Sequence, residues 1–400
     1  MPWRLSDKGL MSSAVNVVIH ASQFPEKVRR DLLESLRARR VNHKFHYDNV
    51  RQTQKWLALH QAYSPTRNDA DCAAIYDRGF AAAAVRVKSK AVHVIGLGCG
   101  GGQKDTRLLK LLKKAGRENF YTPCDVSTAM VLTARRTALA VVPEKNCFSL
   151  VCDLATADDL RDVLEEVGPR CRAASDDPQV VPTVPTRLVT FFGMIPNFEP
   201  QIILPKLASL VRPKDFLLFS ANLAPGADYA AGMKKVLPQY DNPLTRDWLM
   251  TFLLDIGVER GDGELSFEIE DDRANDLKRI VAGFRFTRAR RIEVDGERFD
   301  FHAGEIVRLF FSYRYTPERV RKVLARYGLD VCDQWTTKPE EEGVFLVERR
   351  SPTRRGGSVG VHASACQADK LKLEFQHAGS ETGAPFWLSS RTSSSYPARP

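Results

Sequence analysis

A glycine-rich turn is the first part of this sequence whose residue types could do chemistry. It occupies residues 94–102, V-I-G-L-G-C-G-G-G, between an apolar run and a helical pattern. Glycine has no Cβ, so the backbone of such a turn can approach a nucleotide-like ligand closely. Gly96, Gly98 and Gly101 satisfy the dinucleotide fingerprint, whereas a denser G-x-G-x-G pattern begins at Gly98 and includes Gly100. The glycines predict a cofactor but do not choose which one.

Two aspartates and an asparagine follow the next apolar runs. Asp125 and Asp153 each end a predicted strand, so both should lie at the same sheet edge as the glycine turn. A carboxylate at the first of these positions can accept hydrogen bonds from both hydroxyls of a ribose. Asn197 follows the fourth predicted strand, where its amide carbonyl would suit an amine; the same side chain could instead cap the helix that starts near Glu199. The pattern favours S-adenosylmethionine as cofactor over NAD.

The composition is that of an ordinary globular chain with an excess of basic residues. Of 400 residues, 43% are hydrophobic and 27% charged, and the formal net charge is +10. No apolar run is long enough to cross a bilayer, so we expect a monomeric cytoplasmic protein with no membrane partner. The eight cysteines form no C-x-x-C pair, which favours reduced core thiols and no metal. Two alternatives stay open. The positive charge allows a basic nucleic-acid-binding protein or nucleic-acid methyltransferase on the same fold. The glycines allow an NAD-dependent oxidoreductase.

Short apolar runs alternate with amphipathic segments from about Ala91 onward, which predicts repeated strand–helix units and a mostly parallel sheet. Five strands are predicted at residues 91–98, 120–126, 147–154, 187–195 and 215–223, with helices between them. Ser127 and Thr316 are placed to cap helices. Asp295-Gly296 predicts a hairpin turn. Residues 331–337 and 343–349 should close the sheet as an antiparallel pair.

The predicted architecture is therefore a doubly wound α/β core with a second, smaller α+β domain that binds the substrate. The predicted division is an N-terminal segment at 1–23, a substrate-binding domain at 24–64 and 225–312, a core at 65–224 and 313–350, and a disordered tail at 351–400. The tail is rich in Ser, Gly and Pro and cannot bury enough apolar area to offset the entropy of ordering it.

Several motifs together resemble one known family, the histidine Nα-methyltransferases of ergothioneine biosynthesis and their fungal relatives that methylate a prenylated tryptophan. The resemblance covers roughly residues 42–350 and rests on F-H-Y-D (45–48), Y-S-P-T-R (63–67), L-G-C-G-G-G-Q-K (97–104), Y-T-P-C-D-V-S (121–127), G-M-I-P-N-F-E-P (193–200), A-G-E (303–305) and S-Y-R-Y-T-P-E-R (312–319). It implies a class I S-adenosylmethionine-dependent methyltransferase core with a Rossmann-like sheet.

The resemblance also implies roles for individual residues. Those that correspond to cofactor-binding positions are Gly98, Gly100, Lys104, Asp125 and Asp153. Those that correspond to positions binding or orienting the substrate are Tyr63, Asn197, Tyr240 and Ser312. The implied reaction is transfer of a methyl group from the sulfonium to the neutral nitrogen of an amino acid or related small amine, with no metal.

Two departures from the family pattern affect the site. The acidic or polar residue often found two places before the glycine core is Gly96 in this chain. The glutamate that contacts the imidazole of histidine, two places before Ser312, is Phe310, although a one-residue slip would bring Phe311 there and Glu305 could compensate. Because a buried ring nitrogen without its partner costs roughly 1–3 kcal/mol, Phe310 predicts a less polar acceptor than histidine.

Overall fold

The structure is a computed structural model that describes residues 15–63, 69–169 and 184–350. Its internal contacts divide the chain into two units, residues 1–353 and 354–400. The predicted tail and residues 1–14 of the predicted N-terminal segment lie outside the described residues.

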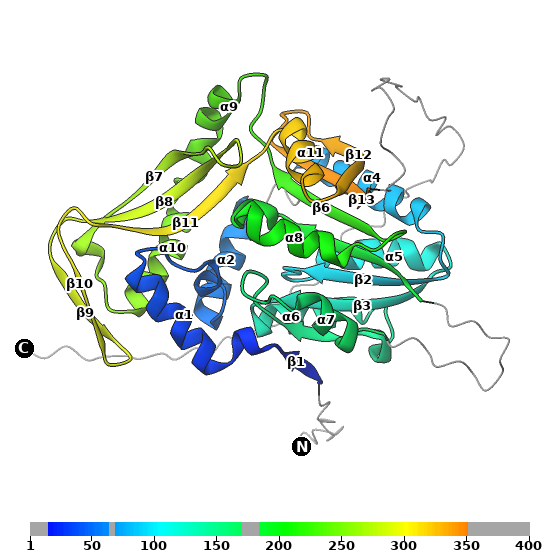
Figure 1. The fold of residues 1–400 in the computed structure, drawn as a ribbon, viewed down its shortest axis with the longest axis horizontal. Coiled ribbons are helices and arrows are strands. Elements are labelled where there is room, and N and C mark those ends of the chain that lie inside the picture. The colour runs from blue at the N-terminus through cyan, green and yellow to red at the C-terminus, as the bar shows by residue number, and fades with distance from the viewer. Residues whose placement is uncertain (1–14, 64–68, 170–183, 351–400) are drawn as a thin grey trace, which may run out of the picture. The chain divides into compact units, whose positions relative to one another are not determined.

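An eight-stranded sheet forms the centre of the first unit, in the order β1-β4-β3-β2-β5-β6-β13-β12 (Figure 1). Its strands are β1 (Val17–Ile19), β2 (Ala91–Leu97), β3 (Glu118–Asp125), β4 (Ser149–Val151), β5 (Thr186–Phe192), β6 (Phe216–Asn222), β12 (Leu329–Thr336) and β13 (Glu342–Arg349). All neighbours are parallel except β13, which pairs antiparallel with β6 and β12. This order confirms the predicted doubly wound core and the predicted closing hairpin.

The sheet order places a topological switch point between β2 and β5. From β2 the chain winds one way through β3 and β4, then returns to β5 and winds the other way through β6. Crossover connections therefore diverge at the carboxyl ends of β2 and β5, which leaves a crevice there. Open α/β sheets bind their ligands in this crevice.

Helices cover both faces of the sheet. The helices of the first unit are α1 (Pro25–Arg37), α2 (Val50–Tyr63), α4 (Ala70–Arg86), α5 (Gln103–Lys114), α6 (Thr128–Ala138), α7 (Leu160–Val167), α8 (Pro200–Leu210), α9 (Tyr229–Val236), α10 (Pro243–Asp255) and α11 (Pro317–Ala325). Short 3-10 turns are η1 (Ala21–Gln23), η2 (His43–His46), η3 (Glu144–Asn146), η4 (Ile195–Asn197), η5 (Leu237–Gln239) and η6 (Arg260–Asp262). Since side chains alternate along a strand, β2 presents Val92 and Val94 to α4 and α5, and Ile95 and Leu97 to the face with α7 and α8.

Residues 24–63 and 225–312 form a second group of elements, which we call the small lobe. Its sheet has the order β11-β8-β7, from β7 (Gly263–Asp272), β8 (Leu277–Phe286) and β11 (Ile306–Arg314) (Figure 1). A hydrophobic core rich in aromatic side chains, including Phe45, Trp248 and Phe284, joins this sheet to the helices. Contacts do not separate the small lobe from the α/β core, so the proposed division into two domains stays a prediction.

Local signals in the sequence predict several boundaries correctly. The hairpin of β9 (Arg290–Val294) and β10 (Glu297–Phe301) turns at Asp295 and Gly296, whose φ angles of 54° and 77° are those of a type I′ turn. Thr316 caps α11 by accepting a hydrogen bond from the Arg319 amide, at 3.2 Å. Ser127 lies at the N-cap of α6, but its side chain makes no capping bond.

Three strands were not predicted. β1 is a three-residue edge strand parallel to β4, so part of the predicted N-terminal segment belongs to the core sheet. β7 and β8 form a long antiparallel pair in a region for which the sequence predicted no strand. Their polar residues lie on the exposed side of a sheet that is covered on one face only.

Candidate functional site

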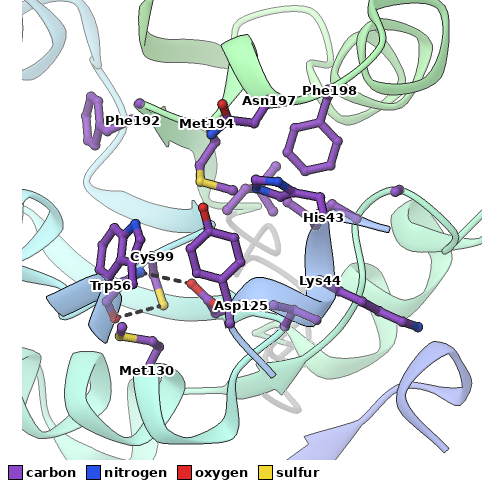
Figure 2. A pocket seen from close by; sticks show the side chains of 18 of the residues that line it. His43, Lys44, Trp56, Cys99, Asp125, Met130, Phe192, Met194, Asn197 and Phe198 are labelled. Atoms are coloured by element: carbon purple, nitrogen blue, oxygen red, sulfur yellow. Dashed lines mark hydrogen bonds between the residues drawn. The ribbon is translucent and has the colours of Figure 1, made fainter. Parts of the chain in front are cut away.

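A cavity of about 880 Å³ lies at the switch point, where the carboxyl ends of β2 to β5 meet η2, α2 and β11. Figure 2 shows its interior: Cys99, Asp125, Met130 and Trp56 line one side, and the His43 ring is directed toward Met194, Asn197 and Phe198 on the other. The first side consists mainly of residues from the α/β core. We call it the cofactor side, and the second the acceptor side.

The glycine turn forms the floor of the cofactor side. Gly98 and Gly100 have φ angles of 59° and 51°, a region that L side chains rarely adopt. A Cβ on Gly98 would lie 2.6 Å from Cγ of Met194, so any side chain there would displace a residue that lines the cavity. A Cβ on Gly100 would meet only Trp56, at 3.7 Å, and would point into the cavity. Both glycines keep room for a ligand against the backbone.

Asp125 lies at the end of β3 and holds the turn in place. Its carboxylate accepts hydrogen bonds from the Gly100 amide, at 3.1 Å, and the Ser127 amide, at 3.0 Å. Burial raises the pKa of this carboxyl, while the backbone donors oppose the shift. The carboxylate retains free lone pairs that can accept the two ribose hydroxyls.

Asp153 lines the cavity beyond β4 and also organises the chain that follows it. Its carboxylate accepts hydrogen bonds from the Ala155 amide, at 2.9 Å, and the Thr156 hydroxyl, at 3.0 Å. Lys44 Nζ lies 3.6 Å from the same carboxylate. The residue therefore combines a turn-capping role with a position on the cofactor side.

Lys104 supplies a buried cation near the start of α5. Its ammonium donates to the Tyr76 hydroxyl at 2.9 Å and lies 4.2 Å from the centre of that ring. Burial lowers the pKa of Lys104, and nearby Glu342, to which Tyr76 donates, opposes the shift. Such a cation beside a helix N-terminus suits the carboxylate of the methionine part of S-adenosylmethionine.

Asp105 accounts for the unusual Gly96. A Cβ on Gly96 would lie 2.2 Å from Oδ2 of Asp105, so the carboxylate of Asp105 fills the space that a side chain at 96 would take. Asp105 accepts hydrogen bonds from Tyr121, at 2.8 Å, and Thr190, at 2.7 Å, and lines the cavity. Burial raises its pKa to about 6. The acid that the family places before the glycine core is thus replaced from the next helix.

Asn197 lines the acceptor side with an amide that is not otherwise used. Within the described part of the chain its side chain makes no hydrogen bond. Glu199, and not Asn197, is the N-cap residue of α8. The alternative prediction that Asn197 caps this helix is therefore wrong. The amide remains available to a ligand.

The other predicted substrate residues do not line the cavity. The Tyr240 hydroxyl donates a hydrogen bond to the Ser312 hydroxyl at 3.0 Å and accepts one from the Arg314 guanidinium at 3.0 Å. These three side chains form a hydrogen-bond network outside the cavity lining. Tyr63 is 53% exposed at the end of α2, and the rest of its motif, residues 64–68, lies outside the described residues. Phe310 is buried against His43 and Trp248, with ring centres 6.1 and 5.6 Å away.

Residues that the sequence did not single out complete the acceptor side: His43, Tyr47, Phe198, Arg308 and Phe311. His43 Nε2 is buried without a hydrogen-bond partner in the described part of the chain. Burial lowers the pKa of His43 to about 3, so the ring is neutral. The F-H-Y-D motif pointed to this segment, although not to His43 itself.

A bulge in β11 explains why Arg308 and Phe311 share the cavity wall. The pairing with β8 shifts register between Arg308 and Phe310. In a regular strand, residues three apart point to opposite faces, and one extra residue brings them to the same face. As a result Phe311, not Phe310, borders the cavity.

Three further observations concern the described residues alone. They contain no cluster of three or more His, Cys, Asp or Glu side chains that could hold a metal ion. Their six cysteines are all free thiols. None of their helices is long and apolar enough to cross a membrane.

The switch-point cavity, the glycine turn and the two strand-end carboxylates fit S-adenosylmethionine, and together they define a class I S-adenosylmethionine-dependent methyltransferase. The model of one family, described as histidine-specific, S-adenosylmethionine-dependent methyltransferases, matches residues 28–349. The chain belongs to this family.

Relatives within the family are distant. An N-methyltransferase, imqF, of Aspergillus flavus is 23% identical over 278 residues, which cover 68% of this chain and 70% of that protein. A histidine N-alpha-methyltransferase of Mycobacterium tuberculosis is 26% identical over 338 residues, 80% of this chain and 95% of that protein. Among solved structures, an S-adenosylmethionine-dependent methyltransferase from Clostridium acetobutylicum covers 74% of this chain and 99% of its own, at 15% identity and a TM-score of 0.37.

Proposed function

We propose that this enzyme methylates the amino nitrogen of an amino acid or related small amine other than histidine. The observation that carries the proposal is the side-chain amide of Asn197, which lines the cavity and has no hydrogen-bond partner among the described residues. The names of the two relatives above, an N-methyltransferase and a histidine N-alpha-methyltransferase, support a nitrogen acceptor. Membership of the family favours this function over nucleic-acid binding and over NAD-dependent oxidoreduction.

S-adenosylmethionine supplies an electrophilic methyl group on a sulfonium that is already a good leaving group. The glycine turn, Asp125 and Lys104 would hold S-adenosylmethionine, which would supply the methyl group to an acceptor bound at Asn197. The carbonyl of Asn197 accepts a hydrogen bond from the acceptor amine and orients its lone pair. An amide adds no negative charge that would favour the protonated, unreactive amine. The aromatic wall excludes water from the amine, which keeps it unprotonated.

The acceptor side offers histidine no free carboxylate among its described residues. Neither Phe310 nor Phe311 supplies one, and Glu305 instead pairs with Arg39 at 3.3 Å. Glu199 does line the cavity, but it binds Arg279 at 2.7 Å and accepts a hydrogen bond from Tyr313. Imidazole would therefore lack the anionic partner that the family's glutamate provides, which supports an aromatic or less polar acceptor.

The proposal includes a monomer that acts in the cytoplasm. The free thiols among the described cysteines agree with a reducing compartment.

A methyl-transfer assay against the standard amino acids and biogenic amines tests this function, with wild type and Asn197→Ala compared. We expect an aromatic or apolar amino acid to be the best acceptor and Asn197→Ala to lower turnover roughly 10- to 100-fold, the usual effect of one lost orienting hydrogen bond. A matched control is Asn275→Ala, whose partners are Asp272 and Gln201. Efficient methylation of histidine, or unchanged turnover in Asn197→Ala, would refute the proposal.

A further inference from the structure

Arg308 presents an unpaired guanidinium to the acceptor side of the cavity. It is half-buried, lines the cavity, and makes no side-chain hydrogen bond or ion pair within the described part of the chain. The guanidinium of Arg308 makes a cation–π contact with the Phe311 ring, whose centre lies 5.2 Å from the guanidinium carbon. A charged group removed from water normally has an ionic or hydrogen-bonding partner.

The carboxylates around Arg308 are already bound by another arginine. Glu199 and Glu270 both act electrostatically on Arg308, but Arg279 forms ion pairs with them at 2.7 and 2.6 Å. The guanidinium carbon of Arg279 also lies 5.3 Å from the centre of the Phe311 ring. Both carboxylates therefore make their direct ion pairs with Arg279, and Arg308 is left without a direct ionic partner among the described residues.

A second unpaired arginine lies beside Arg308. The backbones of Arg40 and Arg308 form a bridge, in which the Val41 amide donates to the Arg308 carbonyl at 2.9 Å. Arg40 is more exposed, also lines the cavity, and likewise has no ion pair among the described residues. Burial lowers the pKa of Arg308, and the charges of Arg279 and Arg40 lower it further, whereas Glu199 and Glu270 oppose the shift.

The other described arginines of the small lobe that are at least partly buried do have partners. Arg291 pairs with Asp300, and Arg288 and Arg290 both pair with Asp262. Arg314 donates to Tyr240 and to two backbone carbonyls. Among the described small-lobe arginines that are at least partly buried, Arg308 is therefore the one without a partner, and it lies at the cavity, where a ligand can supply one.

We propose that Arg308, with Arg40 at its outer side, binds a carboxylate of the methyl acceptor. The inference rests on the proposed function and narrows its substrate class from amines in general to amines that carry a carboxylate, that is, amino acids. A planar guanidinium binds carboxylate through two parallel N–H donors, so it fixes orientation as well as charge. The carboxylate on Arg308 and the amine at Asn197 would hold the acceptor at two points.

Two pairs of compounds test the inference, because their members differ only in the carboxylate: tryptophan and tryptamine, and phenylalanine and phenethylamine. Binding is measured by calorimetry on the full chain in the presence of S-adenosylhomocysteine, for wild type, Arg308→Gln, Arg308→Lys and Arg40→Gln. Arg291→Gln is the matched control, since it removes a guanidinium from the exposed hairpin. Wild type should bind at least one amino acid roughly 10- to 100-fold more tightly than its amine.

In Arg308→Gln this preference should fall to less than about threefold, through loss of affinity for the amino acid alone. Arg308→Lys should keep part of the preference, Arg40→Gln should reduce it by less than Arg308→Gln does, and Arg291→Gln should leave it unchanged. Equal binding of amino acid and amine by wild type, or an equal loss for both in Arg308→Gln, overturns the inference. Tight, Arg308-dependent binding of an amino acid that is never methylated would instead contradict the proposed function and leave the carboxylate site standing.

Discussion

The buried carboxyl of Asp105 should make cofactor binding depend on pH. It lines the cavity, accepts hydrogen bonds from Tyr121 and Thr190, and has a pKa raised to about 6 by burial. S-adenosylmethionine is a cation, so it favours the ionised form of Asp105. As pH falls through 6 the carboxyl of the free enzyme becomes protonated, and affinity should fall with it.

The magnitude follows from the fraction of enzyme with Asp105 ionised. With a pKa of about 6, this fraction is about 0.9 at pH 7 and about 0.1 at pH 5, so the apparent Kd should rise about tenfold between them if only the ionised form binds. Asp105→Asn keeps the shape and an acceptor oxygen for one of the two hydroxyls, but it does not titrate. Its Kd should therefore be weaker at pH 7 and nearly independent of pH.

Calorimetric titration of S-adenosylmethionine at several pH values between 5 and 7 measures this directly. Asp162→Asn is a suitable control, because Asp162 is an exposed carboxylate on α7. A wild-type Kd that stays within twofold over this range would refute the reasoning. So would an undiminished pH dependence in Asp105→Asn, since the titrating group would then be another one, such as Asp125.

Three further predictions concern the cofactor side, the tail and the acceptor side. Gly98→Val should abolish S-adenosylmethionine binding, because its Cβ would collide with Met194. Asp125→Ala should weaken binding by roughly 1–3 kcal/mol, since buried amides lose their acceptor. Wild-type affinity of both variants in calorimetry would contradict this prediction. A chain that ends at Arg350 should melt within a few degrees of the full chain, and a large drop in Tm in calorimetric scans would show that the tail contributes to folding. Phe310→Glu alone should not methylate histidine, because the Phe310 ring packs against His43 and does not line the cavity. The double variant His43→Ala/Phe310→Glu should methylate histidine, and methylation of histidine by the single variant would contradict this reasoning.

The α/β core could be predicted because its signals are local. Each strand that is buried on both faces is a continuous apolar run, and the order of strand and helix then fixes the topology. β7 has no such signal, since its apolar and polar residues alternate. The apolar run of β8, residues 280–284, is short and is flanked by arginines. β1 is too short to be distinguished by its three apolar residues.

The cofactor side followed from the core, but the acceptor side did not. Gly98, Asp125 and Asp153 converge because the carboxyl ends of parallel strands share one edge, which is a property of the topology. His43 lies in the 3-10 turn η2, which is far in sequence from the strands that line the cavity. No hydrophobic periodicity in the sequence predicts that this turn reaches the cavity. Arg308 and Phe311 share one wall only because of the bulge in β11, and a bulge is invisible to an argument from strict alternation.

The central claim is that the methyl group goes to the amino nitrogen of an amino acid other than histidine. The most direct measurement incubates the enzyme with S-adenosylmethionine labelled with carbon-13 in its methyl group and an equimolar mixture of the standard amino acids. Mass spectrometry then identifies the labelled product, and NMR identifies the atom that carries the label. We expect the label on the α-amino nitrogen of an aromatic or apolar amino acid. A label mainly on histidine, or on an oxygen or carbon atom of any acceptor, would contradict it.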